Sequence, residues 1–253
     1  MQAGKTPLLG VAVSGGKDSL VTWDVLHRLG YDAMGIHLDL GIPDFSDVSR
    51  RAVAAFAENR GLTYRIYSLK AQTGYDLPEM ADKTHYEICA LCGAFKRYYI
   101  NYTAVENGLD VIATGHNLDD EAARLLGNML RHQWQYLDKF YPFLPSKHPR
   151  QAARMKPLFR MDEYEIRTYT ACFDIDPANA KCPMNDGATT TYYKQSLNWL
   201  ETKMPGTKRD FLFQYLRDKS PPDHETPGSC ADCGHPTNAG TCGVCKIRRH
   251  LAT

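Results

Sequence analysis

Short apolar runs alternate with amphipathic stretches along the first half of the chain. The runs predict strands at 9–13, 33–40, 62–67 and 109–115, and helical spacing predicts helices at 20–29, at 48–59, up to about 107, and from 116 to 130. Residues 70–88 are mostly polar, so we expect them to be irregular. Strands that alternate with helices imply an α/β fold with a parallel sheet, whose ligands bind at the carboxyl ends of the strands.

Helical patterns dominate the second half. A helix is predicted at 162–173, and 188–219 is predicted to be helical with an interruption near Pro205 and Gly206. Pro221 and Pro222 mark a linker, and the last segment holds four cysteines. We therefore predict a large domain at 1–220 with a helical C-terminal part, followed by a small zinc ribbon-like segment at 221–253.

The turn after the first strand has the composition of a phosphate-binding loop. It reads Ser14-Gly15-Gly16-Lys17-Asp18-Ser19 and leads into a helix, whose free N–H groups would point at an anion. Lys17 is followed by Asp18 where a Walker A loop needs Ser or Thr, and no G-x-G-x-x-G is present. The loop instead resembles the PP-loop of ATP pyrophosphatases. An ordinary strand–turn–helix corner is the alternative, but the six-residue match disfavours it.

Carboxylates and a lysine extend this candidate site. Asp18 would repel a bare phosphate, so we expect it to orient the loop or to hold Mg²⁺, while Lys17 neutralises charge. Asp119-Asp120-Glu121 follows another strand and begins a helix, where simple capping is the alternative interpretation. Because both segments follow strands of one sheet, a shared ATP site is favoured.

Three cysteines form a second candidate site. Cys89-x-x-Cys92 and the distant Cys182 can hold a [4Fe–4S] cluster and leave one iron for an exogenous ligand. A redox pair, or zinc completed by histidine or water, remains open, and Cys172 is also available as a third ligand. Lys96 lies one helical turn after Cys92, so a cation there could bind phosphate or the leaving oxygen.

The last four cysteines predict structural zinc. Cys230-x-x-Cys233 and Cys242-x-x-Cys245 are two knuckles in a segment with too few apolar residues to fold without metal. Four free thiols on a disordered tail are the weaker alternative. The basic residues that follow, Lys246, Arg248, Arg249 and His250, could contact phosphates, although a solvated tail is the default.

Composition and charge limit the binding partners and the cellular compartment that we expect. The 253 residues are 43% hydrophobic with a net charge of +1, so nothing draws the whole chain to nucleic acid or membrane. Residues 139–160 nevertheless contain basic side chains and no acidic one. We expect a cytoplasmic protein, because no apolar run is long enough to span a membrane and no signal peptide fits before the first strand. In that compartment cysteines more often bind metal or react than form disulfides.

Several motifs together are similar to those of the TtcA/TtuA-type tRNA thiolation enzymes, most closely the TtuA branch of 2-thiouridine synthetases. They are Ser-Gly-Gly-Lys-Asp-Ser, Cys-x-x-Cys-Gly-Ala-x-Lys-Arg, Gly-His-Asn-Leu-Asp-Asp-Glu, Leu-Gly-Asn-Met-Leu, Lys-Pro-Leu-Phe-Arg, Cys-Pro-Met and the closing cysteines. The resemblance implies an adenine nucleotide α-hydrolase fold of PP-loop type. It also implies adenylation of a uridine O2 by ATP, followed by attack of sulfur.

The resemblance also implies roles for individual residues. Lys96 and Asp120 match the catalytic lysine and aspartate, and Cys182 joins Cys89 and Cys92 as a ligand of a [4Fe–4S] cluster that carries the sulfide. The ATP-binding set is Ala12, Val13, Ser14, Gly15, Gly16, Lys17, Asp18, Ser19, Leu38, Lys96 and Gly115. The implied partners are tRNA, a sulfur donor or ubiquitin-like sulfur carrier protein, and a second copy of the chain.

One feature departs from the family pattern. TtuA-type proteins usually begin with a zinc finger, whereas this sequence has no cysteine before Cys89. A small molecule or another nucleobase is therefore an alternative acceptor for the same chemistry. A non-catalytic nucleic-acid-binding zinc protein is a second alternative, against which the complete set of Lys96, Asp120 and three cysteines argues. An ATP-using amide ligase would not need those cysteines.

Overall fold

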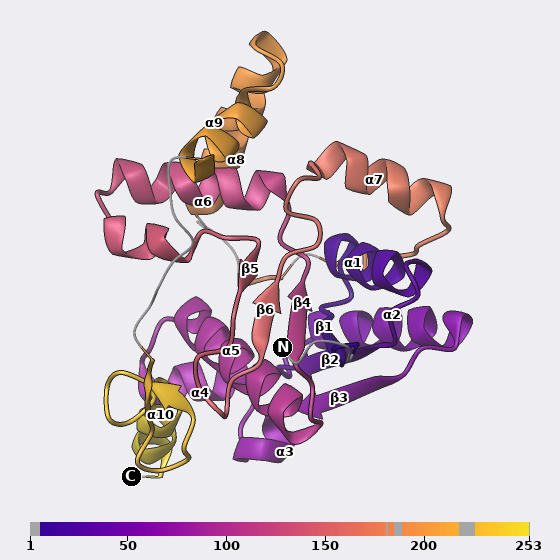
Figure 1. The fold of residues 1–253 in the computed structure, drawn as a ribbon. Coiled ribbons are helices and arrows are strands. Elements are labelled where there is room, and N and C mark those ends of the chain that lie inside the picture. The colour runs from indigo at the N-terminus through magenta and orange to yellow at the C-terminus, as the bar shows by residue number, and fades with distance from the viewer. Residues whose placement is uncertain (1–5, 181, 185–188, 218–225, 253) are drawn as a thin grey trace.

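A computed structural model describes residues 6–180, 182–184, 189–217 and 226–252 (Figure 1). The strands are β1 (Leu9–Ala12), β2 (Ala33–Asp39), β3 (Tyr64–Ser68), β4 (Val111–Thr114), β5 (Phe143–Leu144), β6 (Ala153–Met155), β7 (Gly228–Ser229) and β8 (Pro236–Thr237). The helices are α1 (Lys17–Arg28), α2 (Phe45–Arg60), α3 (Leu69–Thr73), α4 (Leu77–Thr84), α5 (Ile88–Glu106), α6 (Leu118–Leu130), the 3₁₀ helix η1 (Trp134–Lys139), α7 (Glu163–Cys172), α8 (Thr189–Lys203), α9 (Thr207–Arg217) and α10 (Gly243–Leu251).

Six strands form the main sheet in the order β3-β2-β1-β4-β6-β5. The first five in this order are parallel, and only β5 pairs antiparallel with β6. The chain leaves β1 toward β2 on one side and later returns to place β4 on the other side. The carboxyl ends of β1 and β4 therefore flank the point where strand order reverses, which is where open α/β sheets bind ligands.

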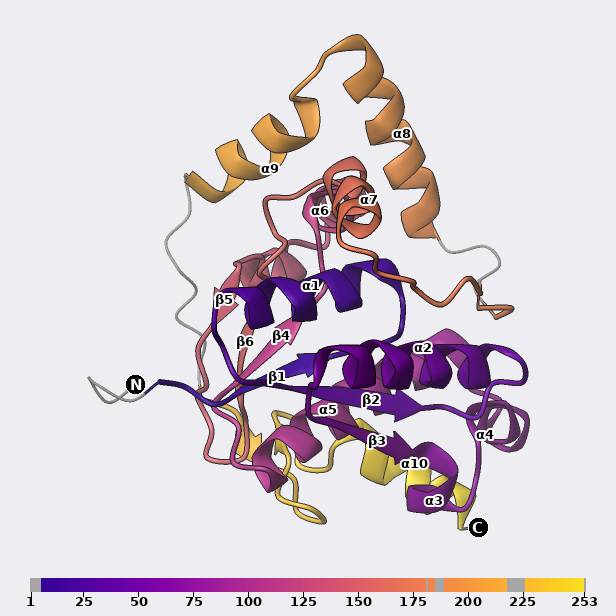
Figure 2. The same cartoon turned by 90° about the vertical axis from the view of Figure 1, so that its right-hand side faces the viewer.

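Helices α1, α2 and α7 cover one face of the sheet (Figure 2). Trp23 of α1 is fully buried, and its indole N–H donates to the carbonyl of Ala33 at 2.8 Å. A Cβ at Gly35 would lie 2.3 Å from the Trp23 ring, so the glycine allows α1 to lie directly on β2. This close packing fixes the position of α1, and with it the loop that precedes the helix.

Helices α4, α5 and α10 share a hydrophobic cluster on the other face. Its buried members include Leu91 and Phe95 of α5, Met80 of α4, and Val244 and Ile247 of α10. The C-terminal segment therefore packs on the helix that carries the Cys89–Cys92 pair. The predicted linker at Pro221 and Pro222, and the domain boundary beside it, lie outside the described residues.

Helices α6, α8 and α9 lie beyond the carboxyl ends of the strands (Figure 1). Buried residues of α6 and α9, such as Leu118, Leu125 and Leu212, join Phe140 and Phe159 in a separate hydrophobic cluster. No helix among the described residues is long and apolar enough to cross a membrane.

The predicted α/β class, mainly parallel sheet and helical C-terminal part are confirmed. The expectation of irregular structure at 70–88 is wrong, because α3 and α4 form there. A capping box explains α4: Asp76 accepts from the N–H of Glu79, and the Glu79 carboxylate accepts from the N–H of Asp76. Strands β5 and β6 were not predicted, because two and three residues are too few to show an alternating pattern.

Candidate active site

The loop at 14–19 lies at the reversal point of the sheet, between the ends of β1 and β4. Gly15 has φ +83°, and a Cβ there would lie 2.7 Å from the carbonyl oxygen of Ser49. A Cβ at Gly115, just after β4, would lie 2.8 Å from the carbonyl carbon of Asp18. Both glycines are thus needed to bring the backbone of α1, α2 and the β4 end together around one loop.

Hydrogen bonds within the loop fix its conformation. The Ser14 N–H donates to Ser19 Oγ at 3.1 Å, and the Ser19 hydroxyl donates to the Gly16 carbonyl at 2.9 Å. Gly16 begins α1 without any side-chain cap. The first N–H groups of α1 are therefore available to a phosphate, as predicted for a phosphate-binding loop.

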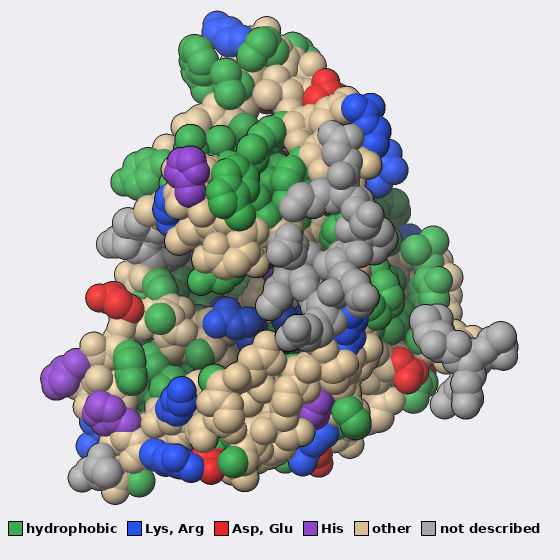
Figure 3. All heavy atoms as spheres, turned by 60° about the vertical axis from the view of Figure 1, so that its left-hand side comes forward, with side chains coloured by type: hydrophobic (Ala, Val, Ile, Leu, Met, Phe, Trp, Pro, Cys, Tyr) green, Lys and Arg blue, Asp and Glu red, His purple; other side chains and the backbone are tan. Residues whose placement is uncertain are grey.

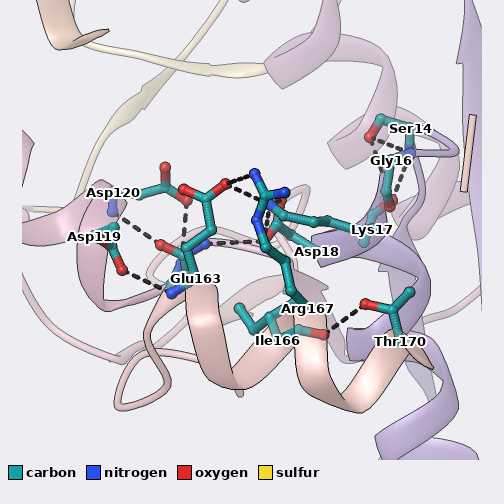
Figure 4. A network of polar contacts seen from close by, with 12 residues as sticks. Ser14, Gly16, Lys17, Asp18, Asp119, Asp120, Glu163, Ile166, Arg167 and Thr170 are labelled. Carbon is teal, nitrogen blue, oxygen red and sulfur yellow. Dashed lines mark hydrogen bonds and ion pairs between the residues drawn. The ribbon is translucent and has the colours of Figure 1, made fainter. Parts of the chain in front are cut away.

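Charged side chains surround the loop in a network that joins four segments (Figure 4). The Lys17 ammonium lies 2.9 Å from Asp18 Oδ2 and 3.3 Å from Glu163 Oε1, and Arg167 binds the same Glu163 oxygen at 2.9 Å. Asn117 donates from Nδ2 to Asp18 Oδ1 at 2.9 Å. Asp18 is thus held in place by a cation and an amide, and both of its predicted roles stay predictions.

The three consecutive carboxylates at 119–121 are in three different environments. Asp119 is buried, where it accepts from Lys208 Nζ at 2.6 Å and from the N–H of Glu163 at 2.8 Å. Glu121 is fully buried and pairs with Lys156 at 2.7 Å. Only Asp120 keeps a partly exposed carboxylate, so Asp119 and Glu121 are structural while Asp120 is accessible to a ligand.

Asp120 also bonds to the start of its own helix. It forms a capping box with Asn117, whose side chain accepts from the Asp120 N–H at 3.0 Å, and it pairs with Lys194 of α8. Burial opposes the charge of Lys194, but the Asp120 carboxylate, followed by those of Glu163 and Asp18, raises its pKa above the ordinary value. The structure thus confirms helix capping by this acidic segment, and Asn117 joins the start of the helix to Asp18 of the loop, while the shared ATP site stays a prediction.

Glu163 and Lys194 are site residues that the sequence analysis missed. The helix predicted at 162–173 places Glu163 at the start of α7, but no local signal links Glu163 to Lys17. Lys194 lies 74 positions from Asp120 in sequence and reaches it only because α8 packs on α6.

Lys96 lies on α5, which packs on the face of the sheet opposite α1. No hydrogen bond or ion pair to the described part of the chain engages its ammonium, although its charge helps to lower the pKa of His37 after the larger effect of burial. His37 is buried with Nδ1 2.8 Å from the carbonyl oxygen of Val13, so its neutral ring donates to the end of β1. Lys96 is thus a cation near the loop that is available to a phosphate.

The Cys89–Cys92 pair occupies the first turn of α5, where Glu87 provides no side-chain cap. The Cys89 thiol donates to the carbonyl of Met184 at 3.4 Å, and both Cys92 and Cys182 pack at the edge of the α4–α5–α10 cluster. Cys172 instead ends α7, which packs on α1. The structure therefore brings the loop of Cys182 to the pair, at a helix N-terminus that favours negative sulfur.

The C-terminal cysteines form a tighter group. The Sγ atoms of Cys230, Cys233, Cys242 and Cys245 all lie within 4.8 Å of one another. The Sγ atoms of Cys233 and Cys242 are 3.8 Å apart, close to the ~3.8 Å edge of a tetrahedron with Zn–S bonds of about 2.3 Å. Burial opposes ionisation of Cys230, but backbone N–H groups, first that of Cys242, lower its pKa to about 6. The group fits structural zinc.

Comparisons with known proteins agree with this geometry. Residues 2–182 match the family model of the PP-loop domain. The chain is 45% identical over 241 residues to the tRNA-5-methyluridine(54) 2-sulfurtransferase of Thermus thermophilus, an alignment that covers 94% of this chain and 75% of that protein. The chain belongs to the PP-loop family of tRNA 2-sulfurtransferases. The protein of the same name from Thermotoga maritima is 35% identical over 253 residues, which are 98% of this chain and 83% of that protein.

A solved structure supports the same family. The U34-tRNA thiolase NcsA from Methanococcus maripaludis, determined with its [4Fe-4S] cluster, superposes with a TM-score of 0.83 at 26% identity and covers 98% of this chain and 82% of that chain. The predicted resemblance and the PP-loop fold that it implies are thereby confirmed. The individual ligand and catalytic residues stay predictions.

Proposed function

We propose that this chain uses ATP to replace the O2 of 5-methyluridine 54 in tRNA with sulfur. One contact carries the proposal: the Ala178 N–H donates to the Gly15 carbonyl at 2.8 Å. Through it the phosphate-binding loop is joined to the segment that continues to Cys182 and contacts Cys89. This contact supports a site in which the part that would activate an oxygen lies beside the part that would supply sulfur. The acceptor is chosen from the names of the Thermus and Thermotoga relatives.

The loop supplies the ATP site. The Gly15–Ser19 backbone and the two serine hydroxyls bind the phosphates that leave, and the backbone around Ala12, Leu38 and Gly115 frames the nucleotide. Asp18 and Asp120 offer carboxylate oxygens to Mg²⁺ at the mouth of the loop. Uridine O2 attacks the α-phosphorus and pyrophosphate leaves. When sulfur then bonds to C2, the C2–O2 bond breaks and O2 leaves as an oxygen of AMP.

Lys96 and Asp120 have complementary roles in this step. The Lys96 ammonium has no acceptor among the residues that the structure describes, so it is free to neutralise charge that develops on the α-phosphate. Asp120 is fixed by its capping box and by Lys194, so its carboxylate keeps one orientation toward the metal or the nucleotide.

Two metal centres complete the proposal. A [4Fe–4S] cluster on Cys89, Cys92 and Cys182 would supply an iron without a protein ligand, at which exogenous sulfide can bind. The exposed Cys89, the half-buried Cys92 and Cys182, and the uncapped α5 N-terminus fit such an open site. Zn²⁺ on Cys230, Cys233, Cys242 and Cys245 would be structural, because no position is left for a substrate.

The proposed reaction requires two partners, and the exposed surface of the chain favours a third. tRNA is the acceptor, and a sulfur donor or a ubiquitin-like sulfur carrier protein delivers sulfide. We also propose a homodimer. Large apolar side chains that remain exposed on one copy, such as Leu130, Trp134 and Tyr136, are available for that contact.

The experiment that tests this function is mass spectrometry of tRNA nucleosides from cells that lack the gene. We expect 2-thio-5-methyluridine to disappear and to return with the wild-type gene. Genes encoding Lys96→Ala or Asp120→Ala should not restore it although the proteins stay soluble, whereas the exposed-lysine control Lys203→Ala should. An unchanged profile of 2-thionucleosides would overturn the assignment of tRNA as the acceptor and favour a small molecule. Loss of 2-thiouridine from position 34 alone would show that position 34, and not position 54, is modified.

A further inference from the structure

Arg154 is a partly buried cation that has no acidic partner in the described part of the chain. It lies in the middle of β6, whose flanking residues Ala153 and Met155 pack into the cluster beneath α1. Because side chains alternate along a strand, Arg154 faces the opposite side of the sheet, which α5 covers. Burial lowers the pKa of its guanidinium, and the charge of Arg97 on α5 lowers it further. No hydrogen bond or ion pair joins Arg154 to any residue that the structure describes.

Arg97 faces the same space from α5 and is also without an acidic partner in the described part of the chain. A Cβ built on Gly93 would lie 2.9 Å from Arg97 Nη1 and 3.5 Å from Nη2. The guanidinium therefore folds back over Gly93, the residue next to Cys92. This contact gives the glycine of the Cys-x-x-Cys-Gly motif a physical role, since it leaves room for Arg97 beside the cysteine pair.

A third arginine continues the cationic strip toward the C-terminal cysteines. Arg150 lies against Gly234, 3.2 Å from the position of a Cβ there, and its only acidic neighbour in the described ranges is Glu106 at 3.8 Å. Figure 3 shows Lys and Arg side chains in the recess between the upper and lower parts of this face. The strip thus runs from the cysteine pair on α5 to the C-terminal segment.

Two guanidinium groups on the same side of the sheet, neither with an acidic partner among the described residues, repel one another unless an anion lies between them. In the proposed function the phosphates of ATP lie at the N-terminus of α1, with Lys96 beside the α-phosphate, which leaves Arg97 and Arg154 for a different anion. Planar guanidinium groups match the oxygen geometry of a phosphodiester. We infer that Arg97 and Arg154 together bind one backbone phosphate of tRNA beside the nucleotide that is thiolated, an inference that rests on the proposed function.

The test measures the affinity of the full-length protein for tRNA across a range of salt concentrations. We expect Arg97→Met and Arg154→Met each to weaken tRNA binding about tenfold and to reduce the salt slope by about 0.7–0.9, the value for one lost phosphate. The double variant should bind tRNA at most about twofold more weakly than either single variant, because all three proteins lose contact with the same phosphate. The KM for ATP should not change.

Arg65→Met is the matched control, since Arg65 is an exposed arginine on β3, toward the opposite edge of the sheet. It should leave the affinity for tRNA and the salt slope unchanged. If Arg154→Met fails to fold, the inference is tested with Arg97→Met and Arg154→Lys instead. The Arg154→Lys protein should keep the wild-type salt slope but bind tRNA more weakly. Unchanged tRNA binding by the Arg97→Met protein would overturn the inference. So would an Arg97→Met or Arg154→Met protein that binds tRNA normally but has a raised KM for ATP. A wild-type protein that does not bind tRNA would overturn it as well. Wild-type protein that binds tRNA without thiolating it would refute the proposed function, while the variants would still decide the phosphate site.

Discussion

The chain holds two groups of cysteines that differ in how they are built. The C-terminal four come from one short segment, are mostly buried and receive backbone N–H groups, such as that of Cys242 to Cys230 Sγ at 3.2 Å. The other three come from α5 and from a loop about 90 residues later, and Cys89 is exposed. The Sγ atoms of the first group lie within 4.8 Å of one another, which makes it a closed group that could surround one metal ion, whereas the exposed Cys89 makes the second an open group.

This difference indicates different tasks. A closed set of four thiolates saturates its metal and contributes folding energy, whereas a set of three leaves a position for an external ligand. The two groups are nevertheless coupled through packing, because α10 and α5 share one hydrophobic cluster. The closed group thus supports the helix that presents the open group.

The largest effect is expected when the open group loses a ligand. Cys182→Ala should abolish thiolation and iron binding, with a change in Tm below about 2 °C because this side chain lies at the edge of the cluster. Activity assays, iron analysis and thermal unfolding check this. Cys172→Ala is the matched control and should keep full activity. Activity that survives in Cys182→Ala and is lost in Cys172→Ala would move the third ligand to Cys172.

Loss of a cysteine from the closed group should lower the stability of the protein rather than its iron binding. Cys242→Ala should lose zinc and at least ~3 kcal/mol of folding free energy, which lowers the Tm by about 6–12 °C. Iron content should fall only in proportion to the fraction of unfolded protein. Zinc analysis and thermal unfolding measure both quantities. A Cys242→Ala protein of unchanged stability would mean that the four cysteines do not hold a structural metal.

Exposure to air separates the two groups without mutation. Anaerobically purified protein should be brown, and air should remove its visible absorbance and its activity while one zinc ion per chain remains. The exposed Cys89 gives oxygen access to the open group, whereas Cys230, Cys242 and Cys245 are buried. Colourless anaerobic protein that contains only zinc would contradict the assignment of the open group.

The smallest effect concerns the contact that couples the groups. The Tyr98 ring of α5 lies 4.6 Å from the His235 ring, between the two knuckles. Tyr98→Leu should cost about 1 kcal/mol, seen as a Tm decrease of about 2–4 °C, and should leave the zinc and iron contents unchanged. Tyr164→Leu, on a ring that is 78% exposed, is the control and should not change the Tm. Loss of iron in Tyr98→Leu would show stronger coupling than the packing indicates.

The sequence predicted the parts of this protein that are encoded locally. The Ser14–Ser19 loop lies between β1 and α1 as expected, and the knuckle spacing at the C-terminus predicted a group that the structure assembles. What could not be predicted depends on contacts between distant segments. Lys194 and Glu163 join the loop only through the packing of α8 and α7, and the Arg97–Arg154 pair needs the register of β6 beside α5.

The most direct test of the account is a single-turnover reaction in an anaerobic chamber. Iron-loaded protein is mixed with sulfide, tRNA that contains 5-methyluridine 54, and ATP, and both AMP and 2-thio-5-methyluridine are measured. We predict that the two products form in equal amounts and that neither forms without ATP. Sulfur incorporation without ATP, or AMP release without sulfur incorporation when every component is present, would contradict the claim that the phosphate-binding loop activates the oxygen that the open cysteine group replaces.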